Sequence, residues 1–148
     1  MDFKETDKFY EYSIEYCSVI ENFKTNGDKG KLRRTLNSLS CLYMQVLKLP
    51  NCETESDTEL DITLQLPKLD LGEYDIYWNI YEPYRHEEPI NGSLVDDLLD
   101  IYRDVKVGTI LYEKTDKREA NWYWKFNFEI HWGKHAVNGL RVLHDICY

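Results

Sequence analysis

The sequence has few of the features that mark exported, membrane or nucleic-acid-binding proteins. Its four cysteines show no Cys-x-x-Cys spacing, which excludes a zinc ribbon and a thioredoxin-type redox site. No run approaches the ~18 apolar residues of a membrane span, and the charged N-terminus does not resemble a signal peptide. Basic residues are also scarce, since 18 of them face 27 acidic residues for a net charge of −9. We therefore expect a cytoplasmic protein that binds neither nucleic acid nor a membrane surface.

Two common catalytic patterns are missing as well. There is no glycine-rich loop of the kind that holds phosphates, and no serine or cysteine lies in a nucleophile-elbow pattern. What the chain does contain is a composition that is 43% hydrophobic and 14% aromatic over 148 residues. That composition excludes a disordered chain, and the length is typical of one domain. We expect a single domain that spans residues 1–148.

The spacing of apolar residues predicts four main helices. Steps of three and four run from Phe9 to Phe23 and from Leu32 to Val46, which indicates two amphipathic helices joined as a hairpin. Further helices are predicted from Ser93 to about Glu113 and, as one long helix, from Asp116 to about Cys147, because each begins with a capping pattern. The predicted fold is all-α, a single helical bundle.

The segment between the second and third predicted helices is acidic and irregular. Residues 51–75 carry eight acidic residues against a single lysine. Apolar and polar residues alternate from Leu60 to Leu66, so we expect an extended segment laid over the bundle. The aromatic spacing from Tyr74 to Tyr81 predicts a short fifth helix, and Asn91-Gly92 predicts a loop. Core packing is the expected role of the aromatic residues between 74 and 84, with a stacking platform as the alternative.

Polar residues interrupt the wide apolar face of the last predicted helix. On a regular helical wheel, Glu129 lies near the centre of this face, and His131 and His135 lie at one edge, stacked four residues apart. A carboxylate buried there would need a cation, a metal or a proton. Gly133 and Gly139, in the same helix, indicate close approach of another helix.

Aspartates share one arc of the helix that begins at Ser93. Hard cations such as Mg²⁺ or Mn²⁺ take oxygen ligands, and helical bundles build such sites between facing helices. Histidines four residues apart serve transition metals such as Zn²⁺. The predicted divalent-metal ligands are Asp97, Asp100, Asp104, Glu129, His131 and His135. Alternatives are a solvated acidic face, a buried salt bridge from Glu129, and histidines that only satisfy hydrogen bonds.

Three stretches of the chain resemble one known family. They are Tyr77-Trp78 with Glu82-Pro83-Tyr84, then Gly92-Ser93-Leu94 with Asp96-Asp97-Leu98 and Asp100-Ile101-Tyr102-Arg103-Asp104, and finally His131-Trp132-Gly133 with His135-Ala136. Over residues 77–144 the chain is similar to the bacterial family catalogued as domain of unknown function 5063. The resemblance implies a bacterial origin and a mostly helical domain. It supplies no activity and no role for any residue.

Two functions of different class follow from the sequence. The first is a protein-binding or adaptor bundle that recognises a protein partner through the acidic central segment. The alternative is a metal-dependent hydrolase-like bundle that acts on a phosphorylated small molecule. In that case Asp97, Asp100, Asp104 and Glu129 would hold a cation that activates water.

Overall fold

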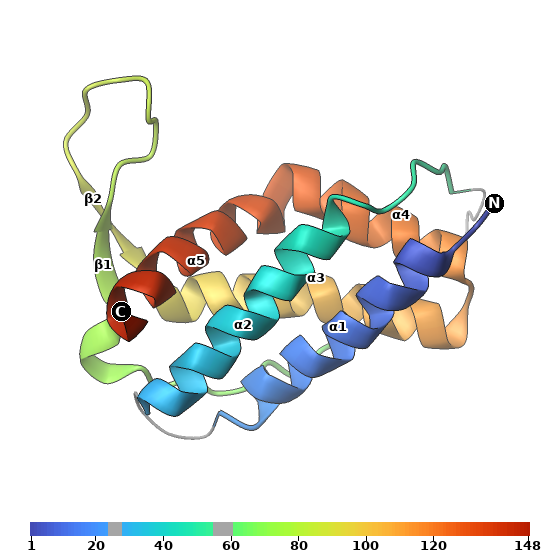
Figure 1. The fold of residues 1–148 in the computed structure, drawn as a ribbon, viewed down its shortest axis with the longest axis horizontal. Helices are drawn as coiled ribbons and strands as arrows, with labels where there is room; N and C mark the ends of the chain where they lie inside the picture. The colour runs from blue at the N-terminus through green and yellow to red at the C-terminus, as the bar shows by residue number, and fades with distance from the viewer. Residues whose placement is uncertain (24–27, 55–60) are drawn as a thin grey trace.

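The computed structural model describes residues 1–23, 28–54 and 61–148 and shows an elongated bundle of helices with a projecting β-hairpin (Figure 1). Within these ranges, no helix is both long and apolar enough to cross a membrane. The elements are α1 (Lys4–Glu21), α2 (Lys29–Val46), a 3-10 turn (Gly72–Tyr74), β1 (Ile76–Asn79), β2 (Ile90–Ser93), α3 (Leu94–Lys114), α4 (Lys117–Asn127), a π-helical turn (Phe128–Trp132) and α5 (Gly133–Cys147).

Helices α2, α3 and α4 each begin at a capping residue, as the sequence predicts for α3 and α4. Asp28, Ser93 and Asp116 each accept a hydrogen bond from a backbone N–H two or three residues further on, over 2.8, 3.1 and 2.8 Å. Such caps satisfy amide groups that the first turn of a helix leaves without partners. The predicted helical bundle is confirmed, and α1, α2 and α3 match the predicted helices closely.

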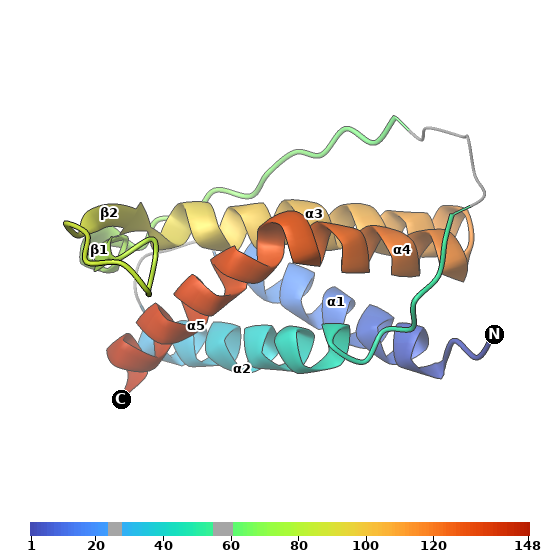
Figure 2. The same ribbon diagram turned by 90° about the horizontal axis from the view of Figure 1, so that it is seen from above.

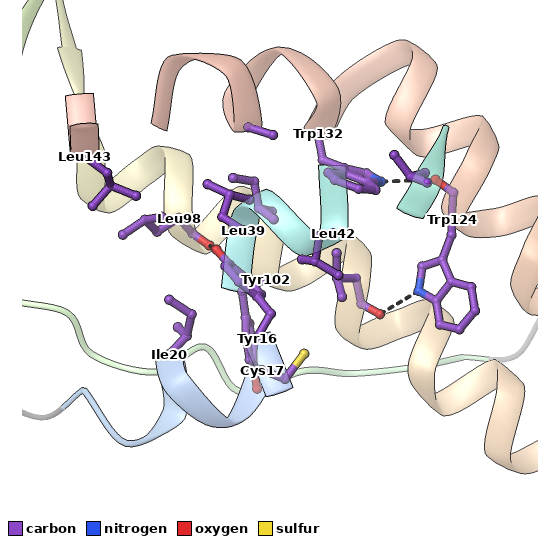
Figure 3. Packing of buried hydrophobic residues seen from close by; sticks show 14 of the residues in the cluster. Tyr16, Cys17, Ile20, Leu39, Leu42, Leu98, Tyr102, Trp124, Trp132 and Leu143 are labelled. Carbon is purple, nitrogen blue, oxygen red and sulfur yellow. Dashed lines mark hydrogen bonds between the residues drawn. The ribbon is translucent and has the colours of Figure 1, made fainter. Parts of the chain in front are cut away.

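The core lies where α1 and α2 pack against α3, α4 and α5 (Figures 2 and 3). The three largest buried side chains each carry one polar atom, and each of these atoms makes a hydrogen bond. Trp124 Nε1 donates to the Val105 carbonyl over 2.9 Å, Trp132 Nε1 donates to the Trp124 carbonyl over 3.1 Å, and the Tyr16 hydroxyl donates to the Leu98 carbonyl over 2.8 Å. These bonds fix the relative position of α1, α3 and the last helical segment, because a buried donor cannot be left unpaired cheaply.

The short helix predicted at residues 74–81 is wrong. Residues 76–79 form β1, which pairs antiparallel with β2 in the register Ile76 to Ser93 and Asn79 to Ile90. The predicted loop at Asn91-Gly92 is also wrong, since both residues lie in β2. Extended backbone is favoured here because Leu94 N donates to the Asp75 carbonyl over 2.8 Å, which ties the start of β1 to the start of α3. The hairpin projects beyond the bundle (Figure 1).

The predicted extended segment is confirmed for the part that the structure describes. Residues 61–71 have no regular secondary structure and run along the bundle (Figure 2). Ile62, Leu66 and Leu69 pack against the core, and Leu71 is buried. The side chains between 61 and 66 alternate between exposed and half-buried, as the period of two predicts. The rest of that prediction, at residues 55–60, lies outside the described residues.

The long last helix is interrupted, which the sequence did not predict. At residues 128–132 the chain forms a π turn, in which Gly133 N donates to the Phe128 carbonyl five residues earlier. A Cβ on Gly133 would lie 2.6 Å from that carbonyl oxygen, so the close neighbour of Gly133 is its own helix. The expected approach of another helix is confirmed at Gly139, where a Cβ would lie 3.3 Å from Leu39 of α2.

Candidate metal centre

Five of the six predicted ligand residues meet where α3 packs against the π turn and α5. The three aspartates lie at positions i, i+3 and i+7 of α3, so they share one face of that helix. The two histidines lie one turn apart, the first in the π turn and the second in α5. The five residues are Asp97, Asp100, Asp104, His131 and His135.

Two of the aspartates each hold one histidine. The Asp104 carboxylate lies 2.6 Å from His131 Nδ1, and the Asp97 carboxylate lies 2.7 Å from His135 Nδ1. Both carboxylates are buried, with side chains 9% and 6% exposed, and a buried carboxylate needs such a partner. Because both pairs use Nδ1, the Nε2 atom of each ring takes no part in them and is the atom that could bind a metal ion.

The third aspartate, Asp100, lies close to both rings. Asp100 Oδ2 is 3.3 Å from His135 Nε2. One ligand atom from each of Asp100, His131 and His135 can be chosen so that all lie within 4.8 Å of one another. Two imidazoles and one carboxylate that converge in this way, with second carboxylates behind the imidazoles, match the first and outer shells of many zinc and iron sites.

The cluster is open to solvent on one side. The side chains of Asp100, His131 and His135 are 28%, 40% and 27% exposed. Arg103 approaches Asp100 to 3.8 Å at the surface, as the solvated-face interpretation of α3 predicts. An exposed pair at that distance contributes little to stability, so it does not account for the buried part of the cluster.

The charges of the cluster favour binding a cation. The hydrogen bond between His135 and Asp97 raises the pKa of His135, so the surrounding carboxylates stabilise positive charge on this ring. Burial raises the pKa of Asp104, and the hydrogen bond with His131 opposes that rise. A metal ion bound at His135 Nε2, beside Asp100, would replace the proton that this atom carries in the protonated ring.

A tyrosine of the hairpin completes the outer shell, and sequence reasoning assigned it no such role. The Tyr77 hydroxyl donates to Asp97 Oδ2 over 2.5 Å, opposite the oxygen that faces His135. Burial and the neighbouring Asp97 raise the pKa of Tyr77, so it stays protonated and donates. Recognising the alternation of residues 76–80 as a strand would have placed Tyr77 on the face opposite Trp78.

Glu129 is not part of the cluster. The prediction that it is buried is wrong, because it is exposed and lines a small pocket of about 150 Å³ with Trp122 and Lys125. The π turn is the physical reason. It adds a residue to one turn, so positions in α4 and α5 do not follow the regular wheel that placed Glu129 at the centre of the apolar face. A buried salt bridge from Glu129 is thereby also wrong.

Fold and site together define a mostly helical bundle with a short strand pair, which carries two histidines and three aspartates on facing helices. The chain belongs to the family described as domain of unknown function (DUF5063), which it matches over residues 2–148. This confirms the predicted resemblance and extends it to the N-terminal hairpin.

A solved structure supports the fold. The chain is similar to the crystal structure of protein BF1032 from Bacteroides fragilis, a structural-genomics target, with a TM-score of 0.76 and 24% sequence identity over 98% of this chain and 96% of that chain. At this identity the likeness concerns the fold alone. No curated protein matches the sequence.

Proposed function

We propose that this protein binds a divalent transition-metal ion through Asp100, His131 and His135, with Asp97 and Asp104 as the carboxylates that orient the two imidazoles. The convergence of these three groups to within 4.8 Å carries the proposal. The two buried Asp–His pairs support it, because an outer-shell carboxylate on Nδ1 holds the ring and increases the basicity of Nε2.

The ligand set favours some metals over others. Imidazole nitrogen suits Zn²⁺ and Fe²⁺, whereas Mg²⁺ takes oxygen ligands and keeps most of its water. Two imidazoles among three ligands therefore favour Zn²⁺ or Fe²⁺ over Mn²⁺, and Mn²⁺ over Mg²⁺.

Hydrolysis is the reaction class that this arrangement supports best. Three protein ligands leave a coordination position for water, which distinguishes catalytic from closed structural sites. The fold also has a large core of its own, so it does not need a metal to hold it together. A water molecule bound at the open side would become a nucleophile near neutral pH, and a phosphorylated small molecule is the proposed substrate class.

Metal titration tests the proposal directly. Metal-free protein is titrated with Zn²⁺, Fe²⁺ (under anaerobic conditions), Mn²⁺ and Mg²⁺ while its thermal unfolding is followed, and p-nitrophenyl phosphate is supplied as a test substrate. A bound ion at 100 times its dissociation constant adds about 2.7 kcal/mol of stability. We expect this shift with Zn²⁺ or Fe²⁺ in the original protein and its loss in Asp100→Asn and His135→Ala.

Two matched variants serve as controls. Glu129→Gln and His144→Ala change exposed residues of the same helical segment outside the cluster, so both should bind metal like the original protein. If no ion shifts the unfolding temperature, or if Glu129→Gln removes the shift as completely as Asp100→Asn, the assigned ligands are wrong.

Protein binding is the second candidate function, and exposed side chains on the middle part of the chain favour it. Asp61, Asp70 and Glu73 are exposed, and Tyr84 of the hairpin is 95% exposed. An acidic, aromatic surface of this kind would bind a basic partner in a salt-sensitive way. If neutralising the acidic residues between 53 and 73 leaves the binding of a recovered partner unchanged, this assignment is wrong.

A further inference from the structure

A second cavity lies away from the histidines, between the hairpin and α5. Its volume is about 510 Å³, within the range of pockets that take small organic ligands. Residues of the hairpin form most of its wall, and one residue of α5 closes it. The lining residues are Trp78, Asn79, Ile80, Pro83, Arg85, Pro89 and Arg141.

The charge of this pocket is opposite to that of the chain. Among the described residues that line it, the only ionisable side chains are the two guanidinium groups of Arg85 and Arg141, although the chain has a net charge of −9. Arg141 is held in place, since its Nη2 donates to the Trp78 carbonyl over 3.0 Å. Arg85 is exposed, and no described residue pairs with its side chain. Two cations therefore line one cavity, and none of the described residues that line it with them is acidic.

Apart from Asn79, the remaining wall of the pocket is apolar. The side chains of Trp78 and Ile80 are 66% and 50% exposed, and two prolines stiffen the loop between the strands. Covering an exposed indole such as that of Trp78 in β1 with a ligand is favourable, because it removes apolar surface from water. Among the residues of the aromatic stretch, Trp78 therefore fits the stacking-platform alternative better than the core-packing prediction.

We propose that this pocket binds a small amphiphilic organic anion, with its carboxylate or phosphate group at Arg85 and Arg141 and its apolar or aromatic body against Trp78. Guanidinium groups bind either anion through paired N–H donors. Indole, isoleucine and proline supply the apolar contact. The proposal does not depend on the metal centre, because none of the proposed metal ligands lines the pocket.

Binding of simple probes tests the pocket. Sodium benzoate and phenyl phosphate are titrated into the full chain, with calorimetry and the indole N–H resonance of Trp78 as readouts; Trp78→Leu assigns that resonance. Inorganic phosphate tests whether an anionic group alone is enough for binding. Benzyl alcohol tests whether an uncharged aromatic body alone is enough. We expect saturable binding of benzoate, phenyl phosphate or both, tighter by about tenfold or more than that of either partial probe.

Arginine variants locate the ligand. Arg85→Gln and Arg141→Gln should each weaken binding by about tenfold, whereas Arg34→Gln, an exposed arginine on α2, should leave it unchanged. Because Arg141 also holds the hairpin backbone, Arg85→Gln is the decisive variant. No saturable binding of either organic anion, equal binding of inorganic phosphate, or unchanged affinity in Arg85→Gln would each overturn the proposal, whatever the outcome at the metal centre.

Discussion

Tyr77 of β1 donates its hydroxyl to Asp97 of α3 over 2.5 Å, although the two residues are 20 positions apart in the chain. Through this bond the hairpin contacts the outer shell of the histidine cluster. The hairpin is therefore more than a connection between α2 and α3, because it holds a carboxylate that in turn holds His135.

Removing this hydroxyl should weaken metal binding without disturbing the fold. In Tyr77→Phe, Asp97 loses one of its two partners and orients His135 less well. Replacing an outer-shell partner typically costs 10–100-fold in metal affinity, and Tyr77 is one contact further out, so we expect a smaller loss of about three- to tenfold. Competition titration with a chelator measures it for Zn²⁺. Equal affinity in the variant and the original protein would show that the hairpin does not influence the site.

The protonation of His135 should make the metal-free protein depend on pH in a defined direction. Its hydrogen bond to Asp97 raises the pKa of His135 above the ordinary 6.5. The pair therefore contributes its full stability below about pH 6.5, and this contribution is lost as the pH rises through the folded-state pKa. An NMR titration of the imidazole should give a pKa above 6.5 in the original protein and a lower one in Asp97→Asn.

Metal binding should show the opposite trend. A metal ligand must be a neutral imidazole, so the ion displaces a proton and its affinity rises with pH over the same range. Calorimetry in two buffers of different ionisation enthalpy should detect the released proton. If zinc binds with an affinity that does not change between pH 6 and pH 8, the ion is not bound by His135.

A substitution at Gly133 should affect both the stability of the fold and the binding of metal. A Cβ there would lie 2.6 Å from the backbone oxygen of Phe128, so Gly133→Ala displaces the π turn that carries His131. We expect lower stability and at least tenfold weaker zinc binding, measured by urea unfolding and by titration. A variant that lost stability but retained full zinc affinity would show that the turn does not position His131.

Gly108 offers a matched change away from the histidines. A Cβ at this position of α3 would lie 2.1 Å from Trp124 Nε1, which would displace the indole from its bond to the Val105 carbonyl. We expect Gly108→Ala to destabilise the protein by about 1–3 kcal/mol and to leave zinc affinity unchanged. Gly139→Ala should change stability by less than about 1 kcal/mol, because its nearest neighbour is the movable end of Leu39 at 3.3 Å. Equal losses in both variants would contradict this packing.

Much of the bundle could be predicted because its signals are local. Caps such as Ser93 and Asp116 and the apolar steps within α1 and α2 depend on residues a few positions apart, and the structure confirms them. The pairing of aspartates on α3 with histidines further along could also be anticipated, since each set shares one face of its helix.

The hairpin and Glu129 could not be predicted for reasons that are physical. In β1 the large apolar residues Ile76 and Trp78 face outward, so the hydrophobic pattern does not mark the buried face. Glu129 was misplaced because a wheel of constant angle assumes an uninterrupted helix, and the energy of the π turn depends on packing at Gly133 and Trp132 that no local pattern reports.

The π turn also adds one residue to the length of the chain, which matters when this protein is compared with its homologues. A turn closed by bonds between residues five apart holds one residue more than an α-turn, so it is equivalent to an insertion into a regular helix. Deleting Ile130, which is 64% exposed, would let this turn close as an ordinary α-turn. Trp124 could then still face the core while His135 faces α3. We expect homologous chains that are one residue shorter at this point to carry the same residues on an uninterrupted helix.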